Sequence, residues 1–174
     1  MRWACLHLLL CLTLILLAQV IPSLAVKDVW MPDEVRHAAV FTNLWQNGHW
    51  LVLHLGDASS ADTPPVYFWL VAAIVSVFGT VQPFVFMVAV AVSAWLLLAA
   101  LAQAGRRMGF DPRVVLLAGL VLLTNWFFIA RAHQPRMDLL FAAFILTAQT
   151  ARFRATQAER LLPRPWRWRG WRWE

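Results

Sequence analysis

Two aspartates, Asp33 and Asp138, lie at the ends of predicted helices beside apolar segments. A charged side chain within a bilayer costs about 2.5 to 3.5 kcal/mol on insertion scales, so a carboxylate near the membrane needs a purpose. Proton transfer is one such purpose. A structural role is the alternative. The positive end of the helix dipole would stabilise the Asp33 carboxylate, and Asp138 would cap a helix. Spacing alone leaves both interpretations open.

The chain that carries these aspartates is too apolar for a soluble domain of its size. Of its 174 residues, 61% are hydrophobic and 14% are charged, so lipid is the expected solvent. Its net charge of +6 could suggest nucleic acid, but the arginines cluster in particular loops, which is typical of membrane topology. Cys5 and Cys11 lie in the first apolar run, which argues against a disulfide framework.

The apolar runs predict an all-α integral membrane protein with about four transmembrane helices. These helices cover residues 3–26, 84–102, 114–130 and 137–151. The first run is long enough for a hydrocarbon core of roughly 30 Å. A cleaved signal peptide is the alternative for that run, because Ser23-Leu24-Ala25 fits a small-x-small cleavage site. Asp111-Pro112 predicts the cap and first turn of the helix that contains the third run.

An acidic polar loop, residues 27–65, separates the first run from the others. Within this loop, Pro32-Asp33-Glu34 predicts the start of a helix that runs to about Trp45 and stops at Asn47-Gly48. The following apolar segment, residues 66–78, is shorter than the roughly 20 residues of a span. We therefore expect an interfacial helix there.

Arginine placement supports this assignment. Short arginine-rich loops are retained on the cytoplasmic side. If residues 66–78 do not cross and the N-terminus is inside, Arg106, Arg107 and the C-terminal tail are inside. The acidic loop and the link Arg131 to Arg136 are then outside, and only that link is a basic segment on the disfavoured side. If residues 66–78 do cross, the two aspartates lie on opposite faces, so the first topology is preferred.

Three blocks of the polar loop carry a resemblance to a known family. They are Trp30-Met31-Pro32-Asp33-Glu34-Val35-Arg36-His37-Ala38, Asn47-Gly48-His49-Trp50-Leu51-Val52 and Thr63-Pro64-Pro65-Val66-Tyr67-Phe68-Trp69-Leu70. In sequence and spacing they resemble the first outer loop of the protein O-mannosyltransferase and lipid A aminoarabinose transferase superfamily, which is similar to glycosyltransferase family 39. Later, Arg136-Met137-Asp138-Leu139-Leu140-Phe141 resembles that family's second outer-loop motif.

The resemblance covers most of residues 28–150 and implies the N-terminal portion of a GT-C fold. Members of the family lie in the cell membrane with the active site on its extracytoplasmic side. They transfer a sugar from a polyprenyl-phosphate carrier to a hydroxyl or phosphate of a lipid, glycan or protein. The family fold includes an interfacial helix after the first loop.

The resemblance also assigns residues. Asp33 would be the catalytic carboxylate, acting as a general base toward the acceptor or orienting it. Glu34 belongs to the same acidic pair but points about 100° away on a helix, so it would support a contact. Arg36 would pair with the donor's phosphate or with Asp33. Asp138 would be a second acidic group in the same cavity.

His37 would line that cavity, and Asp62 would also bind substrate. Many relatives have Glu-Lys before the prolines, whereas this chain has Asp62-Thr63 and lacks the lysine's charge. A phosphate clamp or metal site of those relatives therefore cannot be carried over directly, and a divalent metal ion stays open as a cofactor. The remaining histidines are expected in loops, at interfaces or in the first span, and none shows metal-ligand spacing.

Residues 152–174 alternate arginine and tryptophan toward their end and form a predicted cytoplasmic tail. We expect either a segment that binds anionic lipid or out-of-frame sequence of a truncated gene product. Family members are several times longer, so a non-enzymatic membrane subunit or an inactive fragment is the alternative to an enzyme. A transporter or channel is disfavoured, because polar residues within the spans are few and no repeat of the spans is evident.

Overall fold

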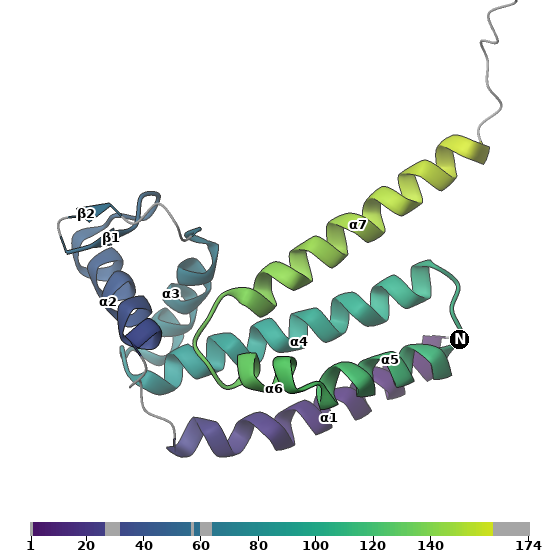
Figure 1. Ribbon diagram of the computed structural model, residues 1–174, viewed down its shortest axis with the longest axis horizontal. Helices are drawn as coiled ribbons and strands as arrows, with labels where there is room; N and C mark the ends of the chain where they lie inside the picture. Colours follow the sequence, from purple (N-terminus) through teal and green to yellow (C-terminus); the bar gives the residue numbers. More distant parts are fainter. Residues whose placement is uncertain (1, 27–31, 57, 60–63, 162–174) are drawn as a thin grey trace, which may run out of the picture.

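The computed structural model describes residues 2–26, 32–56, 58–59 and 64–161, with their side chains except at 2–6, 23–26 and 158–161. Within these ranges the chain is almost entirely helical (Figure 1). The elements are α1 (Arg2–Val26), α2 (Pro32–Asn47), β1 (His54–Leu55), β2 (Ala58–Ser59), α3 (Val66–Phe78), α4 (Pro83–Arg107), α5 (Pro112–Thr124), α6 (Trp126–Ala132) and α7 (Asp138–Leu161).

Helix α4 is the centre of the fold and packs against α1, α3, α5 and α7. It is apolar around its circumference, as expected for a helix enclosed by others. Trp95 of α4 also donates its indole N–H to the Thr13 hydroxyl of α1, at 3.2 Å. The turn between α4 and α5 lies at the same end of the bundle as the N-terminus (Figure 1). The hairpin β1–β2, α2, α3 and the link between α6 and α7 lie at the other end, which we call the site end.

The predicted all-α character is confirmed, but four membrane spans are not. Among the described residues, α4 alone is a single helix long and apolar enough to cross a membrane. α5 and α6 together are long and apolar enough for a second span, but only if the two helices count as one span despite the 67° bend between them. In α1 the apolar stretch found is His7–Pro22. α7 continues past the predicted boundary at residue 151 and carries Arg152 and Arg154, which shortens its apolar part.

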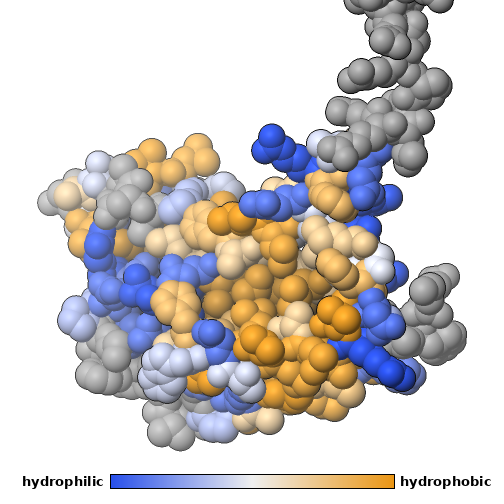
Figure 2. All heavy atoms as spheres, turned by 45° about the vertical axis from the view of Figure 1, so that its right-hand side comes forward, coloured by the Kyte–Doolittle hydropathy of each residue, from blue (hydrophilic) through white to orange (hydrophobic). Residues whose placement is uncertain are grey.

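Hydrophobic side chains gather on one broad area of the surface. Figure 2 shows a broad hydrophobic area over the helices, with hydrophilic residues collected on either side of it. Leu117 and Val121 of α5 and Ile145 of α7 are all more than half exposed. Apolar side chains exposed on such a wide face are typical of a surface that another hydrophobic phase covers.

The structure differs from the single helix predicted over residues 114–130, because Asn125 interrupts it. The Asn125 backbone is extended, and its side-chain oxygen accepts a hydrogen bond from the Phe127 amide at 2.9 Å, which starts α6. Asparagine competes for backbone donors in this way and so favours caps over helix interiors. Gln19 of α1 donates to the Leu123 carbonyl at 3.2 Å, so α1 satisfies one of the acceptors at the end of α5.

The helix boundaries that the sequence predicted from local signals are confirmed. α2 begins at Pro32 and ends before Gly48, whose φ of 74° is left-handed and whose amide bonds to the Leu44 carbonyl at 3.0 Å. α3 covers residues 66–78 as expected. At the start of α5, the Asp111 carboxylate accepts from the Arg113 amide at 2.7 Å, which is the predicted cap.

Gly105 marks a close approach of α4 to α5. A Cβ atom at this position would lie 2.4 Å from Cγ2 of Val115, a β-branched side chain that cannot easily rotate away. We expect Gly105→Ala to lower the free energy of unfolding by about 1–3 kcal/mol. Val115→Ala should recover part of this loss in the double variant, as measured by thermal unfolding in detergent. If the two substitutions are simply additive, the contact between these helices is not the cause.

Candidate active site

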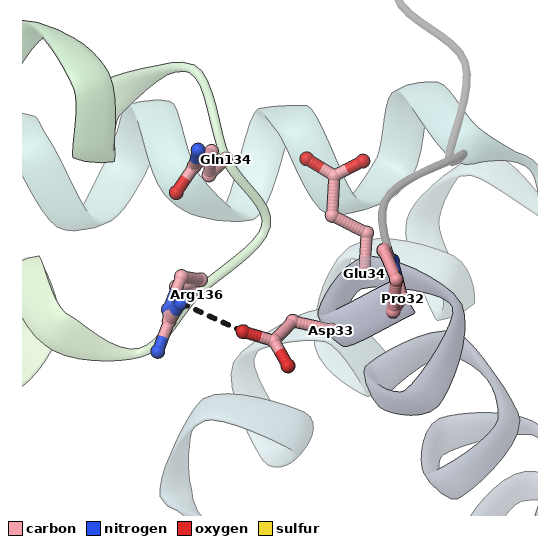
Figure 3. A pocket seen from close by; sticks show the side chains of 5 residues that line it. All are labelled: Pro32, Asp33, Glu34, Gln134 and Arg136. Atoms are coloured by element: carbon pink, nitrogen blue, oxygen red, sulfur yellow. Dashed lines mark hydrogen bonds and ion pairs between the residues drawn. The ribbon is translucent and has the colours of Figure 1, made fainter.

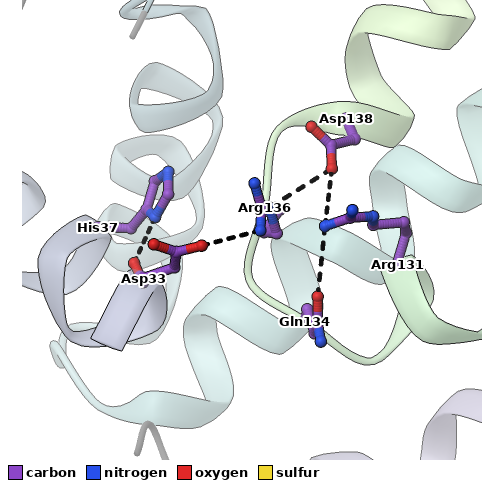
Figure 4. A network of polar contacts seen from close by, with 6 residues as sticks. All are labelled: Asp33, His37, Arg131, Gln134, Arg136 and Asp138. Carbon is purple, nitrogen blue, oxygen red and sulfur yellow. Dashed lines mark hydrogen bonds and ion pairs between the residues drawn. The ribbon is translucent and has the colours of Figure 1, made fainter. Parts of the chain in front are cut away.

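Four charged side chains meet at the site end, where the start of α2 approaches α6 and α7 (Figure 4). Arg136 donates from Nη1 to Oδ2 of Asp33 at 2.9 Å, and its Nε lies 3.4 Å from Oδ2 of Asp138. Nη1 of Arg131 lies 3.3 Å from the same Asp138 oxygen. We call these four residues the aspartate–arginine cluster. Arg136 is its centre, because it is the residue that contacts both carboxylates.

Local structure places each member of the cluster at a helix end. Pro32 fixes the first turn of α2, so Asp33 projects from the start of that helix. Asp138 is the first residue of α7, and Arg131 is in the last turn of α6. Between them, the Arg136 amide bonds to the Gln134 carbonyl at 2.8 Å. The short link therefore folds back on itself and presents the Arg136 side chain toward α2.

Arg131 is held by two further contacts, one with α6 and one with the link. Its guanidinium carbon lies 4.8 Å from the centre of the Phe127 ring, a cation–π contact, and Nη1 lies 3.5 Å from Oε1 of Gln134. Its side chain is 23% exposed, less than that of Arg136 at 32%. Arg131 therefore pairs with Asp138, while the more exposed Arg136 extends toward Asp33.

A cavity of about 390 Å³ opens beside the cluster (Figure 3). Its lining residues are Pro32, Asp33, Glu34, Gln134 and Arg136. Asp33 points toward Arg136, whereas Glu34 points in a different direction and is only 2% exposed. The predicted divergence of these neighbouring carboxylates is therefore observed, and Glu34 forms a buried part of the wall. The volume is within the range of small-ligand sites.

The cluster contributes little to stability. Asp33 is 59% exposed and Asp138 is 39% exposed, and ion pairs with so much access to water are worth about 0–1 kcal/mol. Two carboxylates and two guanidinium groups also balance in charge. Stability alone therefore does not account for these four ionised groups, which come from α2, α6, α7 and the link between α6 and α7.

His37 lies behind Asp33 and not in the cavity wall. Its Nδ1 donates to the Asp33 carbonyl at 2.5 Å, since a carbonyl can only accept. The ring stacks on Phe68 of α3 with 6.0 Å between ring centres, and its side chain is 8% exposed. Nε2 is buried and has no hydrogen-bond partner among the described residues. His37 thus joins α2 to α3 and steadies the turn that carries Asp33.

Neither Arg36 nor Asp62 is part of the cluster that the described residues form. Arg36 is exposed on α2, and the ion pair of Asp33 is formed with Arg136 instead. Asp62 lies outside the described residues. The rings of His49 and His54 lie 4.3 Å apart on the hairpin side of α2. Within the described part of the chain, no group of three or more His, Cys, Asp or Glu could hold a metal ion.

Comparison with curated proteins identifies the family. The chain is 31% identical over 133 residues to the undecaprenyl phosphate-α-4-amino-4-deoxy-L-arabinose arabinosyl transferase of Pseudomonas savastanoi pv. phaseolicola, a match that covers 76% of this chain and 24% of that protein. The chain belongs to this transferase superfamily. Two transferases of the same description from Pseudomonas fluorescens, strains Pf0-1 and Pf-5, are 27% and 28% identical over 83% of this chain.

The chain spans about a quarter of the length of these arabinosyl transferase relatives. No family model matches the sequence. No solved structure matches it either. Membership in the superfamily therefore rests on sequence identity to these transferases, and the GT-C fold stays a prediction.

Arg136 is the member of the aspartate–arginine cluster that lines the cavity and that the sequence analysis did not select as a candidate. A signal for it was present, because the link from Arg131 to Arg136 was the one basic segment that the preferred topology placed outside. In the structure both arginines pair with aspartates at the site end. The predicted exception to the positive-inside pattern is thus the segment that carries the two arginines of the cluster.

Tyr67, the single tyrosine of the chain, is buried in α3, and its hydroxyl has no hydrogen-bond partner among the described residues. Burial raises the pKa of this phenol above its ordinary value, because the phenolate would be poorly solvated. The unfolded chain therefore ionises first, near pH 10, and stability falls as the pH rises above that value.

We expect Tyr67→Phe to leave the free energy of unfolding at pH 7 unchanged or to raise it by up to about 1 kcal/mol. The variant should also lose less stability than the parent above about pH 10. Thermal unfolding at both pH values tests this, and phenolate absorbance of the parent reports Tyr67 alone. A variant that is clearly less stable at pH 7 would show that the hydroxyl has a partner.

Proposed function

We propose that this chain supplies the first-loop part of the active site of a membrane glycosyltransferase, which transfers a sugar from a polyprenyl-phosphate carrier to an extracytoplasmic acceptor. One observation carries the proposal. Arg136 joins Asp33 at the start of α2 to Asp138 at the start of α7, beside one cavity. Family membership supports the same conclusion, since the relatives are described as arabinosyl transferases that use an undecaprenyl phosphate sugar.

The arrangement of the helices supports an extracytoplasmic site. The aspartate–arginine cluster lies at the site end, whereas Arg106 and Arg107 end α4 beside the N-terminus at the opposite end (Figure 1). Basic residues at helix ends favour the cytoplasmic side. A multi-pass chain in the plasma membrane would therefore present its cavity outward, with α3 lying along the outer surface.

Asp33 suits the role of general base in the proposed reaction. It would take the proton of the acceptor hydroxyl as that oxygen bonds to the sugar's anomeric carbon, while the bond from that carbon to the carrier's phosphate oxygen breaks. Its 59% exposure leaves it accessible to an acceptor from the aqueous side. Asp138 would hold Arg136 in position, and Glu34 would shape the wall. Arg36, His37 and Asp62 stay proposed as groups that contact substrate or support the loop.

A chimera tests the proposal, because the chain matches only part of a transferase. The 133 matched residues of this chain would replace the matched segment of the P. savastanoi transferase, and membranes with the chimera would receive radiolabelled undecaprenyl phosphate 4-amino-4-deoxy-L-arabinose. Transfer of label from the donor to another membrane component, separated from the donor by chromatography, is expected to exceed that of membranes without the chimera. A chimera that accumulates like the parent transferase but transfers nothing contradicts the proposal and favours a non-enzymatic subunit.

A further inference from the structure

Arg136 is the only cation among the described residues that line the cavity. Its side chain is 32% exposed and contacts two carboxylates through different nitrogens, Nη1 toward Asp33 and Nε toward Asp138. A guanidinium has five N–H donors in a planar fork, which suits the oxygens of a phosphate. A phosphate that enters this cavity would therefore meet Arg136, already occupied by Asp33.

We propose that Arg136 binds the phosphate of the sugar donor and that Asp33 occupies the same guanidinium when no phosphate is present. This rests on the proposed function, which supplies a phosphate-linked donor. Binding of the phosphate takes over the Nη1 donor and releases the Asp33 carboxylate. The released carboxylate is then free to accept a proton. Occupancy by the donor is thereby coupled to the availability of the base.

The contacts of the cluster permit this exchange. The pair of Asp33 and Arg136 is partly exposed, so separating it costs little, and the Asp33 carboxylate can turn to water. Arg136 keeps a second anchor in Asp138, which Arg131 holds independently at 3.3 Å. The guanidinium therefore stays at the cavity when Asp33 leaves. Because Asp33 and the phosphate compete for Arg136, replacing Asp33 with a neutral residue should increase the affinity for phosphate.

Calorimetric titration of the full chain in detergent with farnesyl phosphate tests the exchange, with farnesol and inorganic phosphate as separate titrants. We expect Arg136→Gln to weaken farnesyl phosphate binding by about tenfold or more, since a charge-assisted contact is lost. Asp33→Asn should tighten it by about threefold, because it frees Arg136. The double variant should bind like Arg136→Gln alone. Arg136→Lys should lie between Arg136→Gln and the parent, which separates loss of charge from loss of fold.

Two further variants make the result decisive. Arg113→Gln, at the opposite end of the bundle, should leave binding unchanged. If Arg36→Gln weakens binding and Arg136→Gln does not, the phosphate is held by Arg36 and the proposal is overturned. Unchanged or weaker binding by Asp33→Asn also overturns it.

The two other titrants test which part of the ligand is recognised. Equal binding of farnesol shows that the prenyl chain alone is recognised, and equal binding of inorganic phosphate shows a site for free phosphate. Either result overturns the assignment to the donor. Because the titration needs no transfer, its failure is distinct from failure of the chimera.

Discussion

Asp33→Asn is expected to lower the rate of sugar transfer by the chimeric transferase by about 10²- to 10⁴-fold, the contribution typical of a general base. Asparagine keeps the size and hydrogen-bonding shape of the side chain but cannot accept the acceptor's proton. The ion pair with Arg136 is lost as well, although the exposure of Asp33 makes that pair unimportant for folding. Radiolabel transfer at saturating donor measures the change directly.

Three controls interpret this variant. Asp33→Glu should retain more activity than Asp33→Asn, because the carboxylate is displaced but present. Asp138→Asn should lose less transfer activity than Asp33→Asn, because Asp138 only positions Arg136. Asp111→Asn makes the same chemical change at the cap of α5 and should transfer sugar at the parent rate. Full activity of Asp33→Asn would remove Asp33 from the catalytic role and leave the structural interpretation of its position.

Phe41→Ala should lower the free energy of unfolding by about 3–5 kcal/mol, the largest stability loss that we expect from one substitution. Phe41 is 0% exposed in α2 and meets the edge of Phe86 of α4 with 5.5 Å between ring centres. It therefore fastens the helix that begins with Asp33 to the central helix. Truncation leaves a cavity at this junction, so the site should loosen together with the fold.

Thermal unfolding in detergent measures the effect, and Phe110→Ala is the matched control. Phe110 is 55% exposed at the turn before α5, so its loss should cost less than about 1 kcal/mol. If both variants unfold at similar temperatures, α2 does not depend on its contact with α4. In that case the junction is held elsewhere, for example by the stacking of His37 on Phe68.

Local signals in the sequence determined the boundaries of α2, α3 and the start of α5. Prolines, capping carboxylates and left-handed glycines act through contacts within one or two turns, so residue types alone specify them. The apolar composition similarly predicted a helical chain. The four predicted spans are not confirmed, because Asn125 breaks one run with its own side chain and α7 continues into residues that carry arginines.

Only the tertiary structure decided which charges meet. Asp33 and Arg136 are separated by 103 positions, and their contact depends on the packing of both α2 and α7 against α4 at the same end of the bundle. The sequence offered Arg36 as the nearby partner, since it lies one turn away on the same helix. The burial of His37 between α2 and α3 was also undecided by spacing. The sequence specifies the residue types and therefore the chemistry available. The partners and burial of these residues depend on packing between segments that are distant in the sequence, which local sequence signals do not predict.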